Sequence, residues 1–428
     1  MTDNAPIKEV QFSDKTYRII QIGNTVYKGK DSFKNRTSDY VTGLLGQEYF
    51  NGKAVLDLGC ASGAILFNIR DQIKLGVGID IDSKKLSIGQ HIIDENNIDN
   101  IKLYQDRMEN VIGSLNRSFD CIFILNILHH TPDPYMILNL AAEFSDDMIC
   151  IEAPLKGRYS PYPRDYAEPA PLPLDVSDIK EYLIEKNYEL LKEVESDNQK
   201  SFMGSTRCVL LFKKKEIKFT KVEDVEFKKG GIIVGPNASG KTTIMNKLYG
   251  NKVEVQNTFE AKDETIVTIK NGIVVNENPK NSNQKTLKYS SHLDRTHRLD
   301  LDSEYPFVFV QPTYKSVQTI VVQPDAPAPY ASPIYRTPDD LSHAFVPNID
   351  AWIDVLKTED KLAIVCYMKP YMHRERLIDR WTYYNQVPTA PKKKKLFERL
   401  MSSYPFWYQS LFYKLERNNI DYIVIKSY

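Results

Sequence analysis

Short apolar runs alternate with helical patterns over the first half of the chain. The runs Ala54–Leu58, Leu75–Asp80 and Phe119–Leu125 have the length and continuous hydrophobicity of buried strands. Helix-compatible segments separate these strands, and that alternation predicts an α/β fold with an open, mainly parallel sheet. Further strand-like runs are Ile101–Asp106, Asp147–Glu152, Tyr188–Val194 and Arg207–Phe212.

The segment 1–49 is polar and aromatic and precedes the first buried run. Two alternating runs flank Gly23 and Asn24, a pair with turn chemistry, and predict a short hairpin within Tyr17–Tyr27. A helix is expected to continue through Tyr40 and Leu45. Two interpretations stay open for this segment, because it could cover an active site or simply pad the next domain.

A second set of strand-like runs follows the lysine-rich stretch Lys213–Lys218. The pattern predicts a second α/β domain, so the expected organisation is a cap at 1–49, one domain at 50–215 and another at 216–428. A helix from Val176 to Glu185 is predicted, with Ser177 as its N-cap. The runs of the second domain are Ile232–Val234, Pro306–Val310, Thr319–Val322, Leu362–Tyr367 and Asp421–Ile425.

Composition narrows the class of protein. The 428 residues include 56 basic and 56 acidic side chains, and this zero net charge gives no bulk electrostatic argument for nucleic acid. The five cysteines lack C-x-x-C spacing, which argues against structural zinc and for a reducing compartment. No basic-then-apolar leader and no membrane-spanning run is present. We therefore expect a soluble, cytoplasmic protein.

The second domain opens with a glycine-rich motif, G-x-x-x-x-G-K-T, between a strand-like run and a helical pattern. Gly235 and Gly240 permit close backbone approach, so that N–H groups can face an anion at a helix N-terminus. Lys241 would reach the terminal phosphates of ATP, and Thr242 would hold Mg²⁺. The other loop residues assigned to ATP are Asn237, Ser239 and Thr243.

The first domain has its own glycine turn, D-x-G-x-x-x-G, from Asp57 to Gly63. A second strand ends on Asp80, about twenty residues after the turn, where a ribose diol needs a hydrogen-bond acceptor. The carboxyl ends of neighbouring parallel strands meet at one sheet edge, so we expect the site there.

These residues resemble the class I S-adenosylmethionine-dependent methyltransferases. The matching stretches are Val55–Gly63, Gly78–Asp80, Gln105–Arg107 and Phe119–Phe123. The resemblance implies S-adenosylmethionine as cofactor and an antiparallel hairpin, formed by the last two strand-like runs, at the end of the sheet. A nicotinamide-binding domain would usually show G-x-G-x-x-G, whose second glycine is missing. By position in the family motif, the cofactor residues are Asp57, Gly59 and Gly63 for the methionine part, Asp80 for the ribose, Asp106 with Arg107 for the adenine side, and Asn126.

The stretch Leu125–Pro134, together with Glu152–Pro154, is similar in style to the family members that modify wobble uridines of tRNA and to their small-molecule relatives. It contains His129 and His130. One of them is a candidate general base, because imidazole titrates near working pH. The alternative is a capping or packing role.

The second domain resembles small-substrate P-loop kinases, since the L-S-G-G-Q signature of transporter ATPases and the N-K-x-D motif of GTPases are both absent. In such kinases a lid after the fourth strand brings arginines to the transferring phosphate, where charge neutralisation assists catalysis. Arg374, Arg376 and Arg380 match that lid, although an exposed helix with ion pairs remains the alternative. Asp325 is a candidate base or metal ligand, with a turn-forming aspartate as the alternative, and Asp294 with Arg295 is a further candidate.

The sequence thus predicts a bifunctional enzyme that methylates and phosphorylates an acceptor, with a small molecule or glycan terminus favoured over nucleic acid. Two alternatives stay open. One is an RNA- or nucleotide-modifying methyltransferase–kinase, and the other is a methyltransferase with a regulatory ATP-binding module.

Overall fold

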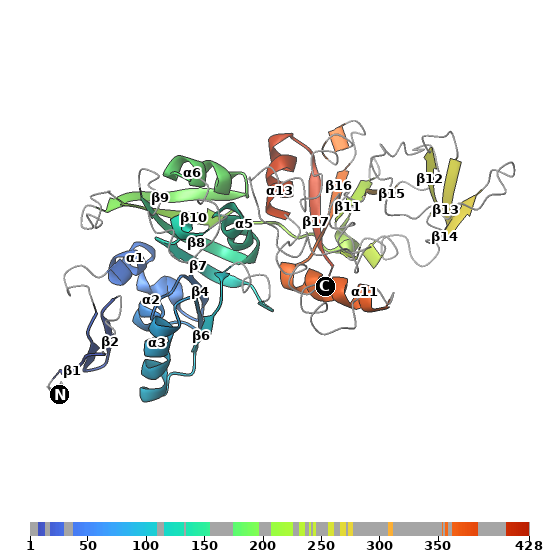
Figure 1. Cartoon of the computed structure of the whole chain (residues 1–428). Coiled ribbons are helices and arrows are strands. Elements are labelled where there is room, and N and C mark those ends of the chain that lie inside the picture. Colours follow the sequence, from blue (N-terminus) through green and yellow to red (C-terminus); the bar gives the residue numbers. More distant parts are fainter. Residues whose placement is uncertain are drawn as a thin grey trace. The chain divides into compact units, whose positions relative to one another are not determined.

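The structure is a computed structural model of the chain (Figure 1). It separates into two compact units whose boundary falls between Lys215 and Glu216. The amide of Lys215 donates to the carbonyl of Asn187 in the first unit at 3.0 Å, whereas Thr220 donates to Val424 in the second at 2.8 Å. The described residues are 7–12, 18–29, 37–108, 115–131, 134–154, 174–196, 207–225, 231–235, 239–240, 243–244, 256–260, 266–270, 273–276, 307–310, 353, 356–357, 362–383 and 408–427.

The first unit contains a seven-stranded sheet with the order β6-β5-β4-β7-β8-β10-β9. Its first five strands in chain order are parallel, and β10 runs antiparallel to both of its neighbours. The predicted parallel α/β sheet and its antiparallel hairpin are therefore confirmed, and the fold is Rossmann-like. The strands are β4 (Ala54–Leu58), β5 (Leu75–Asp80), β6 (Ile101–Gln105), β7 (Phe119–Leu125), β8 (Ser145–Pro154), β9 (Tyr188–Ser196) and β10 (Arg207–Lys214).

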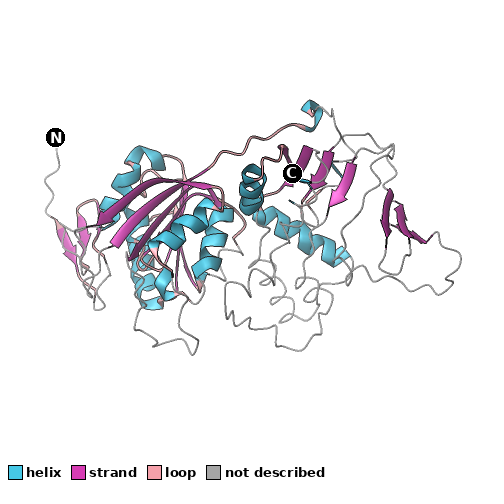
Figure 2. Cartoon of the chain, turned by 90° about the horizontal axis from the view of Figure 1, so that it is seen from above, coloured by secondary structure: helices cyan, strands magenta, loops and turns pink. Residues whose placement is uncertain are grey.

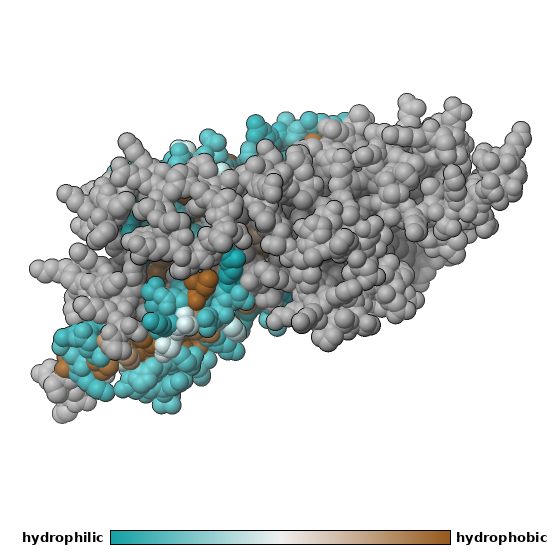
Figure 3. Space-filling view, viewed as in Figure 1, coloured by the Kyte–Doolittle hydropathy of each residue, from teal (hydrophilic) through white to brown (hydrophobic). Residues whose placement is uncertain are grey.

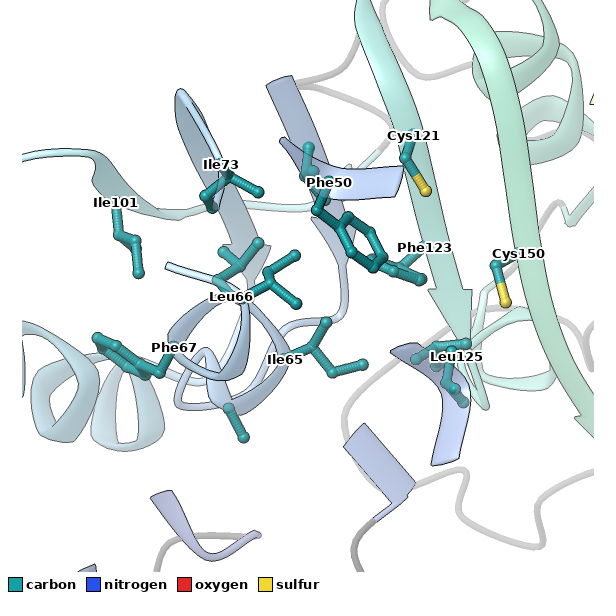
Figure 4. Packing of buried hydrophobic residues seen from close by; sticks show 14 of the residues in the cluster. Phe50, Ile65, Leu66, Phe67, Ile73, Ile101, Cys121, Phe123, Leu125 and Cys150 are labelled. Atoms are coloured by element: carbon teal, nitrogen blue, oxygen red, sulfur yellow. The ribbon is translucent and has the colours of Figure 1, made fainter. Parts of the chain in front are cut away.

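Helices lie on both faces of this sheet (Figure 2). On one face, α1 (Thr37–Leu45), α2 (Ala64–Asn68) and α3 (Ser83–Glu95) share a single apolar core with alternate strand residues. Figure 4 shows Ile65 and Leu66 of α2 on the side of Phe50, whereas Phe67 of the same helix lies on the side of Ile101. The other face carries α5 (Pro134–Phe144) and α6 (Val176–Ile184).

The predicted N-terminal hairpin is confirmed. It consists of β2 (Ile20–Ile22) and β3 (Thr25–Tyr27), and β1 (Lys8–Val10) adds a parallel third strand beside β3. Ile20 and Tyr27 are buried in the same core as α2 and α3. The Tyr27 hydroxyl donates to Oε2 of Glu95 at 2.8 Å and accepts from Nδ2 of Asn96 at 2.8 Å. These bonds fasten the hairpin to the C-terminal end of α3.

At the amino ends of the strands, beside the 3₁₀ turn η2 (Gln47–Phe50), polar side chains bond to one another and to the backbone. The hydroxyl of Tyr49 donates to Asp147 at 2.9 Å, and Asp120 accepts from the amide of Ala54 at 2.8 Å. Lys53 lies between the two carboxylates, 3.6 Å from Asp120 and 3.9 Å from Asp147. The carboxyl edge is therefore the edge at which ligand-binding groups can gather.

The N-cap predicted for α6 was wrong. Asp175, not Ser177, caps the helix, because its side chain accepts from the amide of Asp178 at 2.9 Å. The Asp178 carboxylate returns the bond by accepting from the amide of Asp175 at 2.9 Å, which completes a capping box. The two acidic side chains outcompete the serine because they satisfy two backbone donors together.

The second unit contains a four-stranded parallel sheet with the order β15-β11-β16-β17. The helix α13 (Tyr408–Arg417) packs on it through Leu411, Phe412 and Leu415. A further helix, α11 (Pro370–Tyr383), confirms the helix predicted after the strand at Leu362. The strands are β11 (Gly231–Val234), β15 (Phe307–Val310), β16 (Leu362–Tyr367) and β17 (Tyr422–Lys426), and a separate antiparallel sheet contains β12 (Gln256–Glu260), β13 (Ile266–Lys270) and β14 (Ile273–Asn276).

Among the described residues, no helix combines the length and the apolar character that crossing a membrane requires. Hydrophilic residues predominate on the coloured part of the first unit in the view of Figure 3. The strand predicted at Thr319–Val322 lies outside the described residues.

Candidate functional site

The strand order of the first unit places a topological switch point at β4. From β4 the chain moves outward through β5 to β6, and it then returns to add β7 on the other side of β4. Ligands of open α/β sheets bind at the carboxyl ends of the strands at such a point, because the diverging connections leave a crevice there. The glycine turn predicted from Asp57 to Gly63 follows β4 at this position.

The glycine turn has the backbone geometry that its residues predict. Gly59 has φ of +73° and Gly63 has φ of +84°, both in the left-handed region that favours glycine. The amides of Gly59 and Cys60 donate to the carbonyl of Ile79 at 2.8 and 3.1 Å. The amide of Ala61 donates to the Asp80 carboxylate at 2.7 Å. Three consecutive N–H groups are thus used inside the protein, so this turn is not a phosphate cradle.

Asp80 is held rigidly at the end of β5. Its Oδ2 accepts from the amide of Ala61 at 2.7 Å and its Oδ1 accepts from the amide of Asp82 at 2.8 Å. Each carboxylate oxygen has a further lone pair, so the fixed group can still accept hydroxyl donors such as those of a ribose. The next residue, Ile81, is an apolar side chain that is 53% exposed. The two carboxylate oxygens of Asp80 therefore lie next to the exposed apolar side chain of Ile81.

Asp57 lies within the sheet core at the base of the turn. Its side chain is buried, and burial raises the pKa of its carboxyl group to about 7. The Arg18 guanidinium, which comes from the N-terminal segment, acts to lower that pKa, while the Asp80 charge acts to raise it. A residue outside the predicted cofactor motif thus contributes to the charge balance of this edge.

The third predicted acid, Asp106, follows β6 beside Asp80. The amide of Asp106 donates to the carbonyl of Asp80 at 3.1 Å, and its Oδ1 accepts from the amide of Arg107 at 2.7 Å. The predicted cofactor acids Asp57, Asp80 and Asp106 therefore gather at one edge, with Arg107 next to them.

The turn after β7 brings Asn126 and both histidines to the same edge. The amide of Asn126, whose φ is +57°, donates to the carbonyl of Glu152 at 2.7 Å. The next element is a short 3₁₀ turn, η4 (Leu128–His130), in which the rings of His129 and His130 lie 4.0 Å apart between centroids.

Both histidines have a lowered pKa. Burial lowers the pKa of His129 to about 4, with further lowering by His130 and Arg207. Burial and the charge of Lys85 lower the pKa of His130 as well. Both rings are therefore neutral near pH 7, and a general base becomes weaker as its pKa falls. His130 is the more exposed of the two side chains, so it is the more accessible candidate.

Sequence reasoning assigned no role to several side chains at this edge. Glu152 on β8 and Arg207 on β10 form a buried pair with Nη1 and Oε1 3.6 Å apart. Lys85 acts on His130 from the first turn of α3, where Asp82 is the N-cap. Two sequence signals were available, because Glu152 belongs to the stretch Glu152–Pro154 and the exposed Ile81 directly follows the acid that ends β5.

In the second unit, β11 lies between β15 and β16, so its carboxyl end is also a switch point. Ser239 is fully buried there, and the amide of Ile244 donates to the carbonyl of Gly240 at 3.0 Å. A Cβ atom placed on Gly240 would lie 3.4 Å from Nη1 of Arg376. Gly240 and Arg376 of α11 therefore lie close together.

The remaining predicted residues of this unit fall into two groups. Gly235 and Arg374 are described, and Thr243 is exposed. The side chain of Arg380 lies outside the described residues, as do Asn237, Lys241, Thr242, Asp325 and the pair Asp294–Arg295. No group of three or more His, Cys, Asp or Glu side chains suited to a metal ion occurs in the part of the chain that the structure describes.

Comparison with known proteins supports the class of the first unit. Residues 50–154 match the family model described as a methyltransferase domain. Together with the strand order, the match identifies this part of the chain as a methyltransferase domain of the Rossmann-like fold.

Curated relatives are similar over a short stretch. Ubiquinone biosynthesis O-methyltransferase of Acinetobacter baumannii strain ACICU is 29% identical over 87 residues, which are 20% of this chain and 37% of the relative. The enzyme of strain AYE is 28% identical over 87 residues, with the same coverage. The chain thus spans a little over one third of the length of these relatives.

Solved structures are similar over less than half of this chain. Magnesium protoporphyrin IX methyltransferase from Synechocystis PCC 6803 is 15% identical, with a TM-score of 0.34 and coverage of 42% of this chain and 82% of its own. An S-adenosylmethionine-dependent methyltransferase from Clostridium acetobutylicum is 15% identical, with a TM-score of 0.34 and coverage of 44% and 94%.

Proposed function

We propose that the first unit transfers a methyl group from S-adenosylmethionine to a small molecule or a glycan terminus. The observation that carries the proposal is the fixed carboxylate of Asp80 at the switch point, beside a glycine turn whose amides are already used. A ligand at this edge is recognised through acidic side chains, which suits ribose hydroxyls and a cationic sulfonium better than a phosphate. The family match at residues 50–154 points the same way.

The residues present fit this cofactor. Asp80 would accept from the ribose hydroxyls, and the exposed Ile81 would cover the adenine together with Asp106 and Arg107. Asp57, Gly59 and Gly63 would hold the methionine part, with Asn126 on the far side. When bound, the cofactor supplies an electrophilic methyl group. His130 would take the proton that the methyl acceptor loses. The ring of His129 would pack against the neutral ring of His130.

The test is calorimetric titration of the full chain with S-adenosylhomocysteine. The wild type is expected to bind, and Asp80→Ala is expected to lose binding. Asp71→Ala is the matched control, because Asp71 is 72% exposed and pairs with Arg70 away from this edge. Absence of binding by the wild type would overturn the proposal.

We propose a second activity for residues 216–428, namely phosphoryl transfer from ATP and Mg²⁺. The approach of Arg376 to Gly240 at the carboxyl end of β11 favours this candidate, because a cation at a glycine loop suits a polyphosphate. In this proposal Gly235, Asn237, Ser239, Gly240, Lys241 and Thr243 bind ATP, Thr242 holds Mg²⁺, and Asp325, Arg374, Arg376 and Arg380 serve the transfer.

The kinase proposal has two rivals, an RNA- or nucleotide-modifying enzyme and a regulatory ATP-binding module. Labelled ATP and labelled methyl donor, incubated with glycan, nucleotide and RNA fractions, distinguish them by which fraction takes up each label. Methylation that responds to ATP while no acceptor yields ADP would favour the regulatory module. An RNA fraction that takes both labels would favour the first rival.

A further inference from the structure

Glu152 is a buried acid at the carboxyl edge to which the proposed function gives no role. It lies on β8, opposite Leu125 of β7 and Val209 of β10, and is 1% exposed. Its carbonyl accepts from the amide of Asn126 at 2.7 Å. Glu152 is therefore directly beside the turn that carries the two histidines.

The carboxylate of Glu152 is only partly satisfied. Its Oε1 lies 3.6 Å from Nη1 of Arg207, which is beyond hydrogen-bond distance. Its Oε2 is buried and has no hydrogen-bond partner in the part of the chain that the structure describes. A buried carboxylate oxygen without a donor is unfavourable, since burial has removed it from water. The position suits a donor that arrives with a ligand.

The charges around Glu152 restrict that donor. Arg207 is close enough to lower the pKa of His129, and Lys85 acts in the same sense on His130. Arg207 already balances the charge of Glu152 across 3.6 Å, so the unpaired oxygen lacks a hydrogen-bond donor among the described residues and does not need a second cation. A hydroxyl group donates a hydrogen bond without bringing positive charge, so it fits the site better than an amine.

Building on the proposed methyltransferase function, we infer that Glu152 binds the methyl acceptor and that the acceptor is a hydroxyl compound. Oε2 of Glu152 accepts a hydrogen bond from the hydroxyl group, and Arg207 faces Oε1. The hydroxyl oxygen gains the methyl group, its proton passes to the imidazole of His130, and the electron pair of the broken carbon–sulfur bond stays on sulfur. The product is a methyl ether.

The test compares Glu152→Gln with Glu193→Gln. The first variant keeps the side-chain volume but loses the charge. The second neutralises Glu193 on β9 of the same sheet, whose carboxylate pairs with Lys180 at 3.0 Å. Calorimetry with S-adenosylhomocysteine comes first, and both variants are expected to bind it within about twofold of the wild type because neither residue belongs to the cofactor site. Failure of the wild type to bind would refute the proposed function itself, which separates the two hypotheses.

The acceptor is then assayed with methyl-¹³C-labelled S-adenosylmethionine and fractionated cell extract. The carbon resonance of the transferred methyl group distinguishes a methyl ether from N-methyl and S-methyl products. A dilution series of the active fraction gives an apparent KM and kcat. Glu152→Gln is expected to raise the apparent KM about tenfold or more with a smaller change in kcat, since a hydrogen bond to a charged group is lost. Glu193→Gln is expected to match the wild type.

Three results would overturn the inference. One is a methyl group on nitrogen or sulfur, and another is an unchanged apparent KM for Glu152→Gln, which would assign Oε2 to a bound water. The third is a wild-type protein that binds S-adenosylhomocysteine yet forms no methyl ether in any fraction. Thermal unfolding of both variants is measured alongside, and an equal loss of kcat and of folded protein would assign Glu152 a structural role only.

Discussion

The two units each place a glycine motif after a strand of a parallel sheet, but the described side chains near the two motifs differ in charge. In the first unit, Asp57, Asp80 and Asp106 gather at the edge. In the second, Arg376 of α11 approaches Gly240. Both sheets have a switch point, and each places its glycine motif there. Side chains from neighbouring elements then determine whether the site favours a cationic or an anionic ligand.

The use of the amides differs as well. In the first turn, the amides of Gly59, Cys60 and Ala61 donate to the end of β5. Those groups cannot also bind an anion, so recognition passes to the carboxylates. A glycine pattern alone therefore does not indicate a phosphate site. A glycine turn can bind a phosphate only where its N–H groups do not already donate hydrogen bonds within the protein.

The largest effect is expected for Asp80→Ala. The change removes an acceptor that holds Ala61 and Asp82 and the proposed acceptor for the ribose. Affinity for S-adenosylhomocysteine should fall about 1,000-fold, equivalent to about 4 kcal/mol for two charge-assisted hydrogen bonds. Calorimetry measures this loss, and ATP affinity measured on the same variant should stay at the wild-type value. A parallel loss of ATP binding would contradict separate sites.

The pH dependence of unfolding should reveal Asp57. Burial raises its pKa to about 7 in the folded protein, whereas an unfolded aspartate titrates near 3.9. A raised pKa means stability that is present below pH 4 and lost as pH rises toward 7, here about 4 kcal/mol. Urea denaturation across this range should therefore show a steeper loss for the wild type than for Asp57→Asn.

The contribution of Asp57 is the difference between the wild type and Asp57→Asn in the pH dependence of their unfolding free energy. His129, with its lowered pKa, acts in the opposite sense and gains stability as pH rises from about 4 toward 6.5. Subtraction removes that contribution because both proteins contain it. Superimposable curves would show that Asp57 is not the group responsible.

Lys241→Ala tests the second turn. Loss of the ammonium group should lower ATP affinity about 100-fold, because one charge-assisted contact to the phosphates disappears. Equilibrium binding of a fluorescent ATP analogue in the presence of Mg²⁺ is the measurement. Binding of S-adenosylhomocysteine serves as the internal control and should not change.

A smaller effect is expected for Arg376→Ala. Its guanidinium lies close to Gly240, so its removal should lower ATP affinity about tenfold. Glu375→Ala, one position earlier on α11 and exposed, is the matched control. Equal affinities for the two variants would favour an exposed ion-paired helix over a lid.

Most strands of the two larger sheets were predictable because they are short apolar runs with turn residues at their ends. The runs at Leu75–Asp80 and Leu362–Tyr367 coincide with β5 and β16. The gathering of Asp57, Asp80 and Asp106 at one edge also followed from strand order alone, since parallel strands end at the same side. Whether these residues bind the cofactor stays a prediction.

Contacts that depend on register or on exact capping were not predictable. Glu152 and Arg207 are far apart in sequence and meet only because β8 and β10 pair antiparallel. Asp175 and Ser177 are both good capping residues, and periodicity cannot fix a helix start to within two positions. Arg18 reaches the environment of Asp57 through a segment that carried no motif.

The hydrogen bonds that Tyr27 makes with Glu95 and Asn96 determine where the first unit can be cut for expression on its own. A fragment cut at the family match would begin near Phe50 and end near Pro154. It would discard the hairpin whose Ile20 and Tyr27 fill the core, together with the antiparallel strands β9 and β10. Such a fragment should aggregate on expression, whereas one that runs to Lys215 and keeps the N-terminal residues retains every apolar contact described for this unit.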